Sequence, residues 1–133
     1  MSAGSAVPGG ERSWTVQDHL DAAPAEQVEL YRAVERIIRD CGPVTLSVSK
    51  TTITFKGERR GFAGARPVAR GVRGYLDLTR RLAGDPRIQR ATPYTKRLFV
   101  NQFLITASAQ LDEQFRAWVH EAYRVGQGDH LRG

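Results

Sequence analysis

The sequence predicts an α+β fold of two layers, with an N-terminal helix and a C-terminal helix packed on an antiparallel sheet of four to five short strands. Apolar residues recur at helical spacing near both ends of the chain, and they alternate with polar residues in the segments between. Glycine-rich turn sequences separate those segments, and strands joined by tight turns pair antiparallel. At 133 residues, the chain is long enough for one domain with its own core.

The chain divides into three parts on composition. Residues 1–12 are small and rich in glycine and proline, as in a disordered tail; residues 13–127 form the domain, and residues 128–133 are expected to fray. We find no apolar run typical of a signal peptide or a membrane span, and we expect no membrane partner. The single cysteine, Cys41, excludes an internal disulfide and favours a cytoplasmic location.

The helices are predicted from their apolar stripes and their end signals. A short helical turn is expected at 14–20, where Thr15 is the N-cap and Asp18 completes a capping box. The first long helix begins near Pro24 and stops before Gly42-Pro43. The last helix carries an apolar stripe over 111–125, and we expect Ser108 to cap it.

Alternation of apolar and polar residues predicts the strands. The predicted strands are 44–48, 51–56, 62–68, 75–79 and 98–105. Pro67 indicates that the third strand is at an edge or ends there, because proline cannot donate to a neighbouring strand. The segment 80–96 is expected to be a long loop, since it contains Gly84-Asp85-Pro86 and Thr92-Pro93.

Positive charge is concentrated in the middle of the chain. Residues 50–97 contain thirteen Lys or Arg and three acidic residues, a net charge of +10, whereas the flanking parts are slightly acidic. Such a field attracts an anionic partner, and we place nucleic acid first and an acidic protein second. Tyr75 and Tyr94 lie within this region and could stack on bases. The predicted anion-binding residues are Lys56, Arg60, Arg66, Arg70, Arg73, Arg80, Arg81 and Arg97.

The charge does not identify the partner by itself. Seventeen of the twenty basic residues are arginine, a bias that GC-rich coding can also produce. The sequence has no helix-turn-helix signal, no aromatic motif of the common RNA-binding sheets and no glycine-rich phosphate loop. An anion-binding surface therefore remains one hypothesis among others.

The alternative hypothesis is a small-ligand pocket between the sheet and the last helix, in a binding protein or a small enzyme of secondary metabolism. Asn101 shares a strand face with Phe99 and Phe103, so it either bonds to the backbone or lines a pocket. His19 beside the capping Asp18 has either a structural role or an acid–base role. The candidate pocket residues are His19, Lys50, Tyr75, Asn101, Phe103 and Trp118.

No motif for catalysis or for a cofactor stands out. The three histidines lack the spacing of metal ligands, so we expect no metal and no cofactor. Nucleophile and paired-carboxylate motifs are also missing, which leaves open whether the protein is an enzyme.

Several stretches together resemble a known family. The chain resembles the small bacterial domain-of-unknown-function family 5655 over residues 13–127, and some members of that family carry the label "predicted transport protein". The resemblance implies the same α+β layout and, in some members, fusion to nuclease-like or methylase-like domains. It implies no catalytic residues, and this chain departs from it near Asn101-Gln102, where a histidine is expected. The stretches are 14–20, 41–43, 50–55, 62–64, 111–115 and 118–126.

Overall fold

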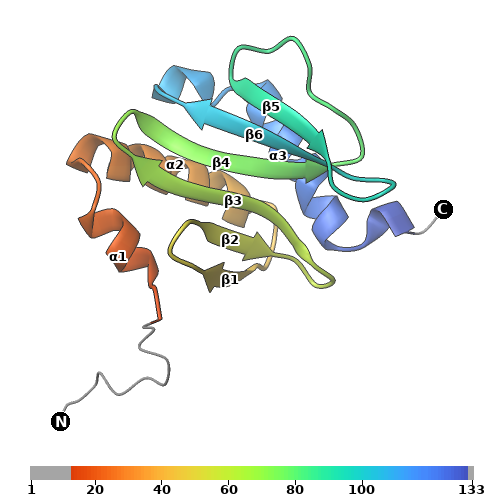
Figure 1. Cartoon of the computed structure of the whole chain (residues 1–133), viewed down its shortest axis with the longest axis horizontal. Helices are drawn as coiled ribbons and strands as arrows, with labels where there is room; N and C mark the ends of the chain where they lie inside the picture. The colour runs from red at the N-terminus through yellow and green to blue at the C-terminus, as the bar shows by residue number, and fades with distance from the viewer. Residues whose placement is uncertain (1–12, 132–133) are drawn as a thin grey trace.

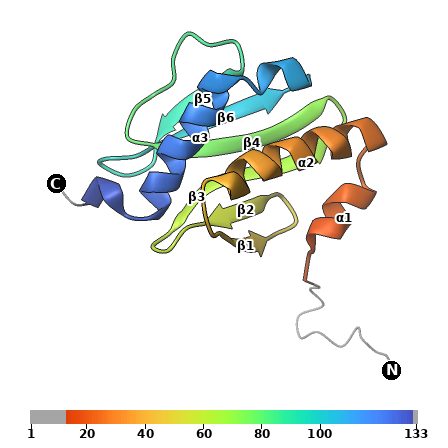
Figure 2. The same ribbon diagram turned by 180° about the vertical axis from the view of Figure 1, so that it is seen from behind.

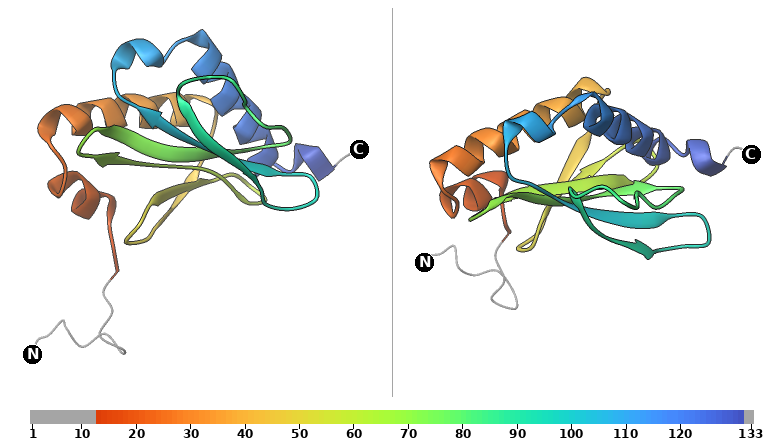
Figure 3. Two further views of the ribbon diagram at one scale, coloured as in Figure 1. Left: turned by 45° about the horizontal axis from the view of Figure 1, so that its top comes forward. Right: turned by 90° about the horizontal axis from the view of Figure 1, so that it is seen from above.

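Two long helices lie against the same face of a six-stranded antiparallel sheet in the computed structural model of the protein (Figure 1 and Figure 2). The structure describes residues 13–131. Seen edge-on, the helices occupy one side of the sheet (Figure 3). The strand order is β1-β2-β3-β4-β6-β5. The strands are β1 (Thr45–Val48), β2 (Ile53–Lys56), β3 (Gly61–Val68), β4 (Gly71–Leu78), β5 (Ile88–Pro93) and β6 (Phe99–Ile105).

The N-terminal helices follow the sequence signals closely. Helix α1 (Val16–Asp21) begins with the predicted capping box, in which Thr15 and Asp18 exchange hydrogen bonds of 3.0 and 3.1 Å. Helix α2 (Ala25–Asp40) follows and turns its apolar stripe toward the sheet. It ends before Gly42, whose φ of 149° favours glycine and where a Cβ would collide with the Tyr123 hydroxyl.

The sheet has one strand more than predicted, because part of the expected loop 80–96 is β5. This strand pairs with β6 at the edge of the sheet, with a bulge between Ile88 and Arg90. None of its residues is buried, and the bulge breaks the alternation, so the sequence pattern is too weak to reveal it. Pro67 lies near the end of β3, which is an interior strand and not an edge.

The C-terminal part also differs from the sequence prediction. Helix α3 (Glu113–Gly126) is capped by Asp112, which accepts a hydrogen bond of 2.9 Å from the Phe115 N–H, and not by Ser108. Ser108 instead begins the 3₁₀ helix η2 (Ser108–Gln110). Another 3₁₀ helix, η3 (Asp129–Leu131), lies within the segment expected to fray. The predicted N-terminal tail, residues 1–12, lies outside the described residues.

The core fills the space between the sheet and the two long helices. Phe55, Phe103 and Phe115 are almost completely buried there, and the Phe103 and Phe115 rings pack edge to face, 5.4 Å apart. Tyr31 of α2 is fully buried in the same core, and its hydroxyl has no hydrogen-bond partner among the described residues. Burial also raises the pKa of this phenol.

We predict that Tyr31→Phe stabilises the protein, because it removes a buried hydroxyl that has no hydrogen-bond partner in residues 13–131. The free energy of unfolding should rise by about 1 kcal/mol, measured by urea denaturation at neutral pH. Tyr123→Phe is the control, since the Tyr123 hydroxyl donates a hydrogen bond of 3.1 Å to the Pro43 carbonyl and its loss should destabilise. Equal destabilisation by both substitutions would contradict the prediction.

Candidate functional site

The face of the sheet that the helices leave open, which we call the open face, is polar. Residues paired across antiparallel strands point to the same side, so the register assigns this face row by row. The middle row is Thr54, Gly64, Tyr75, Gln102 and Arg90. The row on one side is Arg66, Arg73 and Leu104, and the row on the other side is Asp77, Val100 and Thr92.

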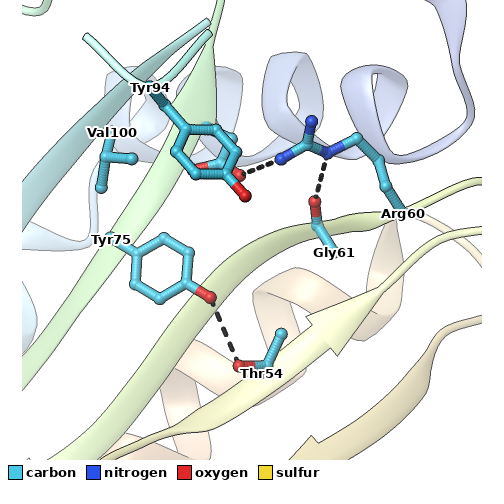
Figure 4. Close-up of a pocket in the computed structure, with 7 residues that line it drawn as sticks. Thr54, Arg60, Gly61, Tyr75, Tyr94 and Val100 are labelled. Carbon is cyan, nitrogen blue, oxygen red and sulfur yellow. Dashed lines mark hydrogen bonds and ion pairs between the residues drawn. The ribbon is translucent and has the colours of Figure 1, made fainter. Parts of the chain in front are cut away.

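A pocket of about 520 Å³ lies on the open face. Its walls come from β2, β3, β4 and β6, from the turn before β3 and from the connection between β5 and β6. Figure 4 shows the rings of Tyr75 and Tyr94 on two sides of it and the Arg60 side chain across from them. The lining residues are Thr54, Arg60, Gly61, Tyr75, Asp77, Tyr94 and Val100.

The Tyr75 ring lies across the neighbouring strand because that strand has a glycine there. A Cβ on Gly64, which pairs with Tyr75, would overlap the tyrosine ring. The ring can therefore reach over β3, and its hydroxyl lies 3.3 Å from the Thr54 hydroxyl on β2 (Figure 4). Burial raises the pKa of Tyr75, so its hydroxyl keeps its proton at neutral pH and can donate or accept.

A buried carboxylate forms part of the pocket. Asp77 is only 5% exposed, and its Oδ2 accepts a hydrogen bond of 3.0 Å from Nη2 of Arg60. The other oxygen, Oδ1, is buried without a partner among the described residues. Burial raises the pKa of Asp77 to about 6, although the positive charge and the hydrogen bond of Arg60 act in the opposite direction. At neutral pH the pocket thus contains an ionised carboxylate with an unused acceptor.

Arg60 connects the carboxylate to the exposed rim. Its Nε donates to the Gly61 carbonyl at 2.9 Å, which fixes the guanidinium beside Asp77. The guanidinium carbon lies 5.3 Å from the centre of the Tyr94 ring, within the range of a cation–π contact. Tyr94 is 61% exposed, so its ring forms the outer wall of the pocket.

Two arginines stand opposite each other beside the pocket. Arg66 on β3 pairs in register with Arg73 on β4, and neither forms an ion pair within residues 13–131. Like charges directly opposite on antiparallel strands destabilise the sheet. Arg73 lies two residues before Tyr75 on the same strand, so both side chains are on the open face.

The remaining predicted anion-binding residues do not gather at this site. Arg80 forms two hydrogen bonds of 3.0 Å with Glu121 of α3, and Arg97 donates to the His130 carbonyl at 2.7 Å. Arg81 stacks over the Phe99 ring at 5.0 Å. Lys56 is exposed at the end of β2, and Arg70 is exposed in the turn between β3 and β4.

Arg87, which is outside the predicted set, has its charge satisfied within the fold. Its side chain is 7% exposed and forms ion pairs of 2.8 Å with Asp85 and Asp112. It also lies over the Trp118 ring at 4.5 Å. The arginine excess therefore includes structural arginines, whose charges are satisfied within the fold, as well as the half-buried Arg66 and the exposed Arg73 beside the pocket.

The six candidate pocket residues are likewise dispersed, and only Tyr75 lines the pocket on the open face. Asn101 is fully buried; its Oδ1 accepts from the Leu82 N–H at 2.8 Å, and its Nδ2 donates to the Arg80 carbonyl at 3.1 Å. His19 is buried with its Nε2 2.8 Å from the Ser49 carbonyl. Phe103 and Trp118 belong to the core, whereas Lys50 is exposed.

Sequence reasoning did not single out Asp77 or Thr54. The alternation over 75–79 places Asp77 on the face of Tyr75, opposite Leu76 and Leu78, and this is the signal available in the sequence. Its contact with Arg60 depends on how the turn before β3 folds, which local pattern does not reveal.

The described part of the chain supplies no evidence for a metal site, because no group of three or more metal-ligating side chains comes together in it. No helix in residues 13–131 combines the length and the apolar character needed to cross a membrane.

Comparison with known families matches residues 16–126 to DUF5655, which is described as a domain of unknown function. Comparisons with curated proteins and with solved structures found no match. The match covers both long helices and all six strands.

We predict that Asp77 makes the protein less stable as the pH rises. Its pKa is higher in the folded state than the ordinary 3.8, so the folded state binds the proton more tightly, and this stabilisation is lost between about pH 4 and pH 6. The free energy of unfolding of wild type minus that of Asp77→Asn should be about 2 kcal/mol larger at pH 4.5 than at pH 7.5, which means that wild type is relatively more stable at the lower pH. Denaturant titrations at both pH values test this, and identical pH dependence of the two proteins would rule it out.

Proposed function

The chain belongs to the DUF5655 family, and we propose that it is a non-catalytic module that binds single-stranded nucleic acid on the open face of its sheet. The phosphates would lie along the exposed arginines, and unpaired bases would stack on the two tyrosines of the pocket. Proteins that bind single strands combine a positively charged surface with aromatic stacking in this way.

The facing arginines Arg66 and Arg73 carry the proposal. Their repulsion costs stability, and no acidic side chain in the described part of the chain neutralises either of them by an ion pair. A phosphate placed between them would remove the repulsion and accept hydrogen bonds from both planar guanidinium groups. The pair therefore fits a surface that is complete only with an anion bound.

The position of the tyrosines favours single strands over a duplex. Tyr75 and Tyr94 border the pocket next to this arginine pair, and Arg90 extends the row that contains Tyr75 to the edge strand. A ring can stack on a base only if that base is not already paired and stacked inside a double helix. We therefore expect single-stranded RNA or DNA to bind more tightly than duplex DNA.

We predict that Arg73→Glu weakens binding to a single-stranded oligonucleotide about tenfold or more without unfolding the protein. The new carboxylate faces Arg66 across the strands, so it replaces repulsion with attraction in the fold while removing the anion site. Fluorescence anisotropy over a series of salt concentrations measures the affinity. The slope of log K against log salt should become shallower by about 1 to 2.

The matched control is Arg36→Glu, which changes the net charge equally at an exposed position of α2 on the helix side. It should retain most of the wild-type affinity. Equal losses in both variants would show that only overall charge matters, and binding that does not respond to salt would contradict the proposal.

A small-ligand function is the second candidate, and the pocket volume of about 520 Å³ favours it, since ligand sites span roughly 300 to 1,000 Å³. This pocket is on the open face and not between the sheet and α3. Oligonucleotide length distinguishes the two functions. Affinity that rises with length supports the nucleic acid module, whereas a mononucleotide that binds as tightly as a nonamer supports the small-ligand function.

A further inference from the structure

We propose that the pocket selects guanine among the unpaired bases of the bound strand, through the side-by-side Arg60 guanidinium and Asp77 carboxylate. This inference rests on the proposed function, because it names the base that the same surface would hold. Its evidence is the order of hydrogen-bonding groups in the pocket, which is independent of the arginine pair at Arg66 and Arg73.

Arg60 and Asp77 place a donor next to two acceptor atoms, one of which, Oδ1, is buried from solvent. Arg60 has five N–H bonds, and the described structure uses one from Nε and one from Nη2, which leaves three for a ligand. The adjacent Asp77 Oδ2 has a further lone pair, and Oδ1 accepts no hydrogen bond from the described residues. The sequence of groups is thus donor, acceptor and acceptor.

Among the four common bases, only guanine carries the complementary order of groups, which is acceptor, donor and donor. Its Watson–Crick edge carries the O6 acceptor, the N1–H donor and the N2 amino donor in turn. Cytosine and adenine place an amino donor beside a ring acceptor, and uracil flanks one donor with two acceptors. With any of these three bases, either an acceptor atom of the base would face the carboxylate or a polar group of the pocket would lack a partner. Both outcomes are costly for buried groups.

Burial makes the selection stronger. Asp77 is 5% exposed, so a hydrogen bond to it forms away from competing water. The base would enter between Tyr75 and Tyr94. Because Tyr94 is the most exposed residue of the lining, turning its ring aside gives up the cation–π contact with Arg60 and little buried packing. Once inside, the base can stack on a tyrosine ring while its edge meets the ion pair.

The phosphate site lies at a compatible position. Arg73 precedes Tyr75 by two residues on β4, a separation of about 7 Å along the strand. A nucleotide with its base in the pocket therefore carries its phosphate toward the Arg66–Arg73 pair. One nucleotide can therefore place its base in the pocket and its phosphate at the arginine pair at the same time.

The test is a set of heptamers of uridine with one central G, A, C, U or inosine, measured by fluorescence anisotropy at one salt concentration. We expect the heptamer with G to bind about tenfold more tightly than those with A, C or U. Inosine lacks the N2 amino group but keeps O6 and N1–H, so its affinity should be intermediate. The inosine result depends on the ligand alone and does not require a variant that folds.

Asp77→Asn tests the carboxylate directly, with Asp40→Asn, at an exposed position on α2, as the matched control. The Asp77 variant should lose the preference for G and keep salt-dependent binding, whereas the control should keep both. Equal affinity of wild type for all five heptamers, or a preference that survives Asp77→Asn, overturns guanine selection while leaving the proposed function standing. Failure of every heptamer to bind overturns the proposed function itself and the selection with it.

Discussion

The packing of both long helices on one face of the sheet decides the chemistry of the other face. In each strand, alternate residues point to opposite sides, so burying Ile53, Phe55 and Leu76 under the helices turns their neighbours outward. Those neighbours include Thr54, Tyr75 and Asp77. The helices also supply acidic partners for arginines on their own side, such as Glu121 for Arg80, whereas Arg66 and Arg73 on the open face form no ion pair within residues 13–131.

The candidate site depends on a few contacts that support one another. Gly64 gives the Tyr75 ring room to cross β3, and the Arg60 guanidinium holds the Asp77 carboxylate ionised at neutral pH despite its burial. Ion pairs as buried as this one rarely add net stability, because removing the charges from water costs about as much as the attraction returns. A buried pair with one oxygen unused therefore fits a binding role better than a purely structural one.

Much of the fold was predictable, because local patterns encode it. The capping box at Thr15, the stop at Gly42 and the alternation over 44–56 gave α1, α2 and the first strands correctly. The edge strand β5 was missed because its pattern is broken by a bulge. The site was harder to predict, since it joins Arg60 to Asp77 and Tyr94 across β3, β4 and the β5–β6 connection. Such contacts depend on strand order, which no short stretch of sequence contains.

The most direct test that the open face is the binding surface is NMR of the four tyrosine rings during titration with the G-containing heptamer. Tyr75 and Tyr94 line the pocket, whereas Tyr31 and Tyr123 lie on the helix side and serve as internal references. We predict that the ring resonances of Tyr75 and Tyr94 shift with the added oligonucleotide while those of Tyr31 and Tyr123 stay in place. Shifts confined to Tyr31 and Tyr123, or no shift at Tyr75 and Tyr94 at saturating oligonucleotide, would contradict it.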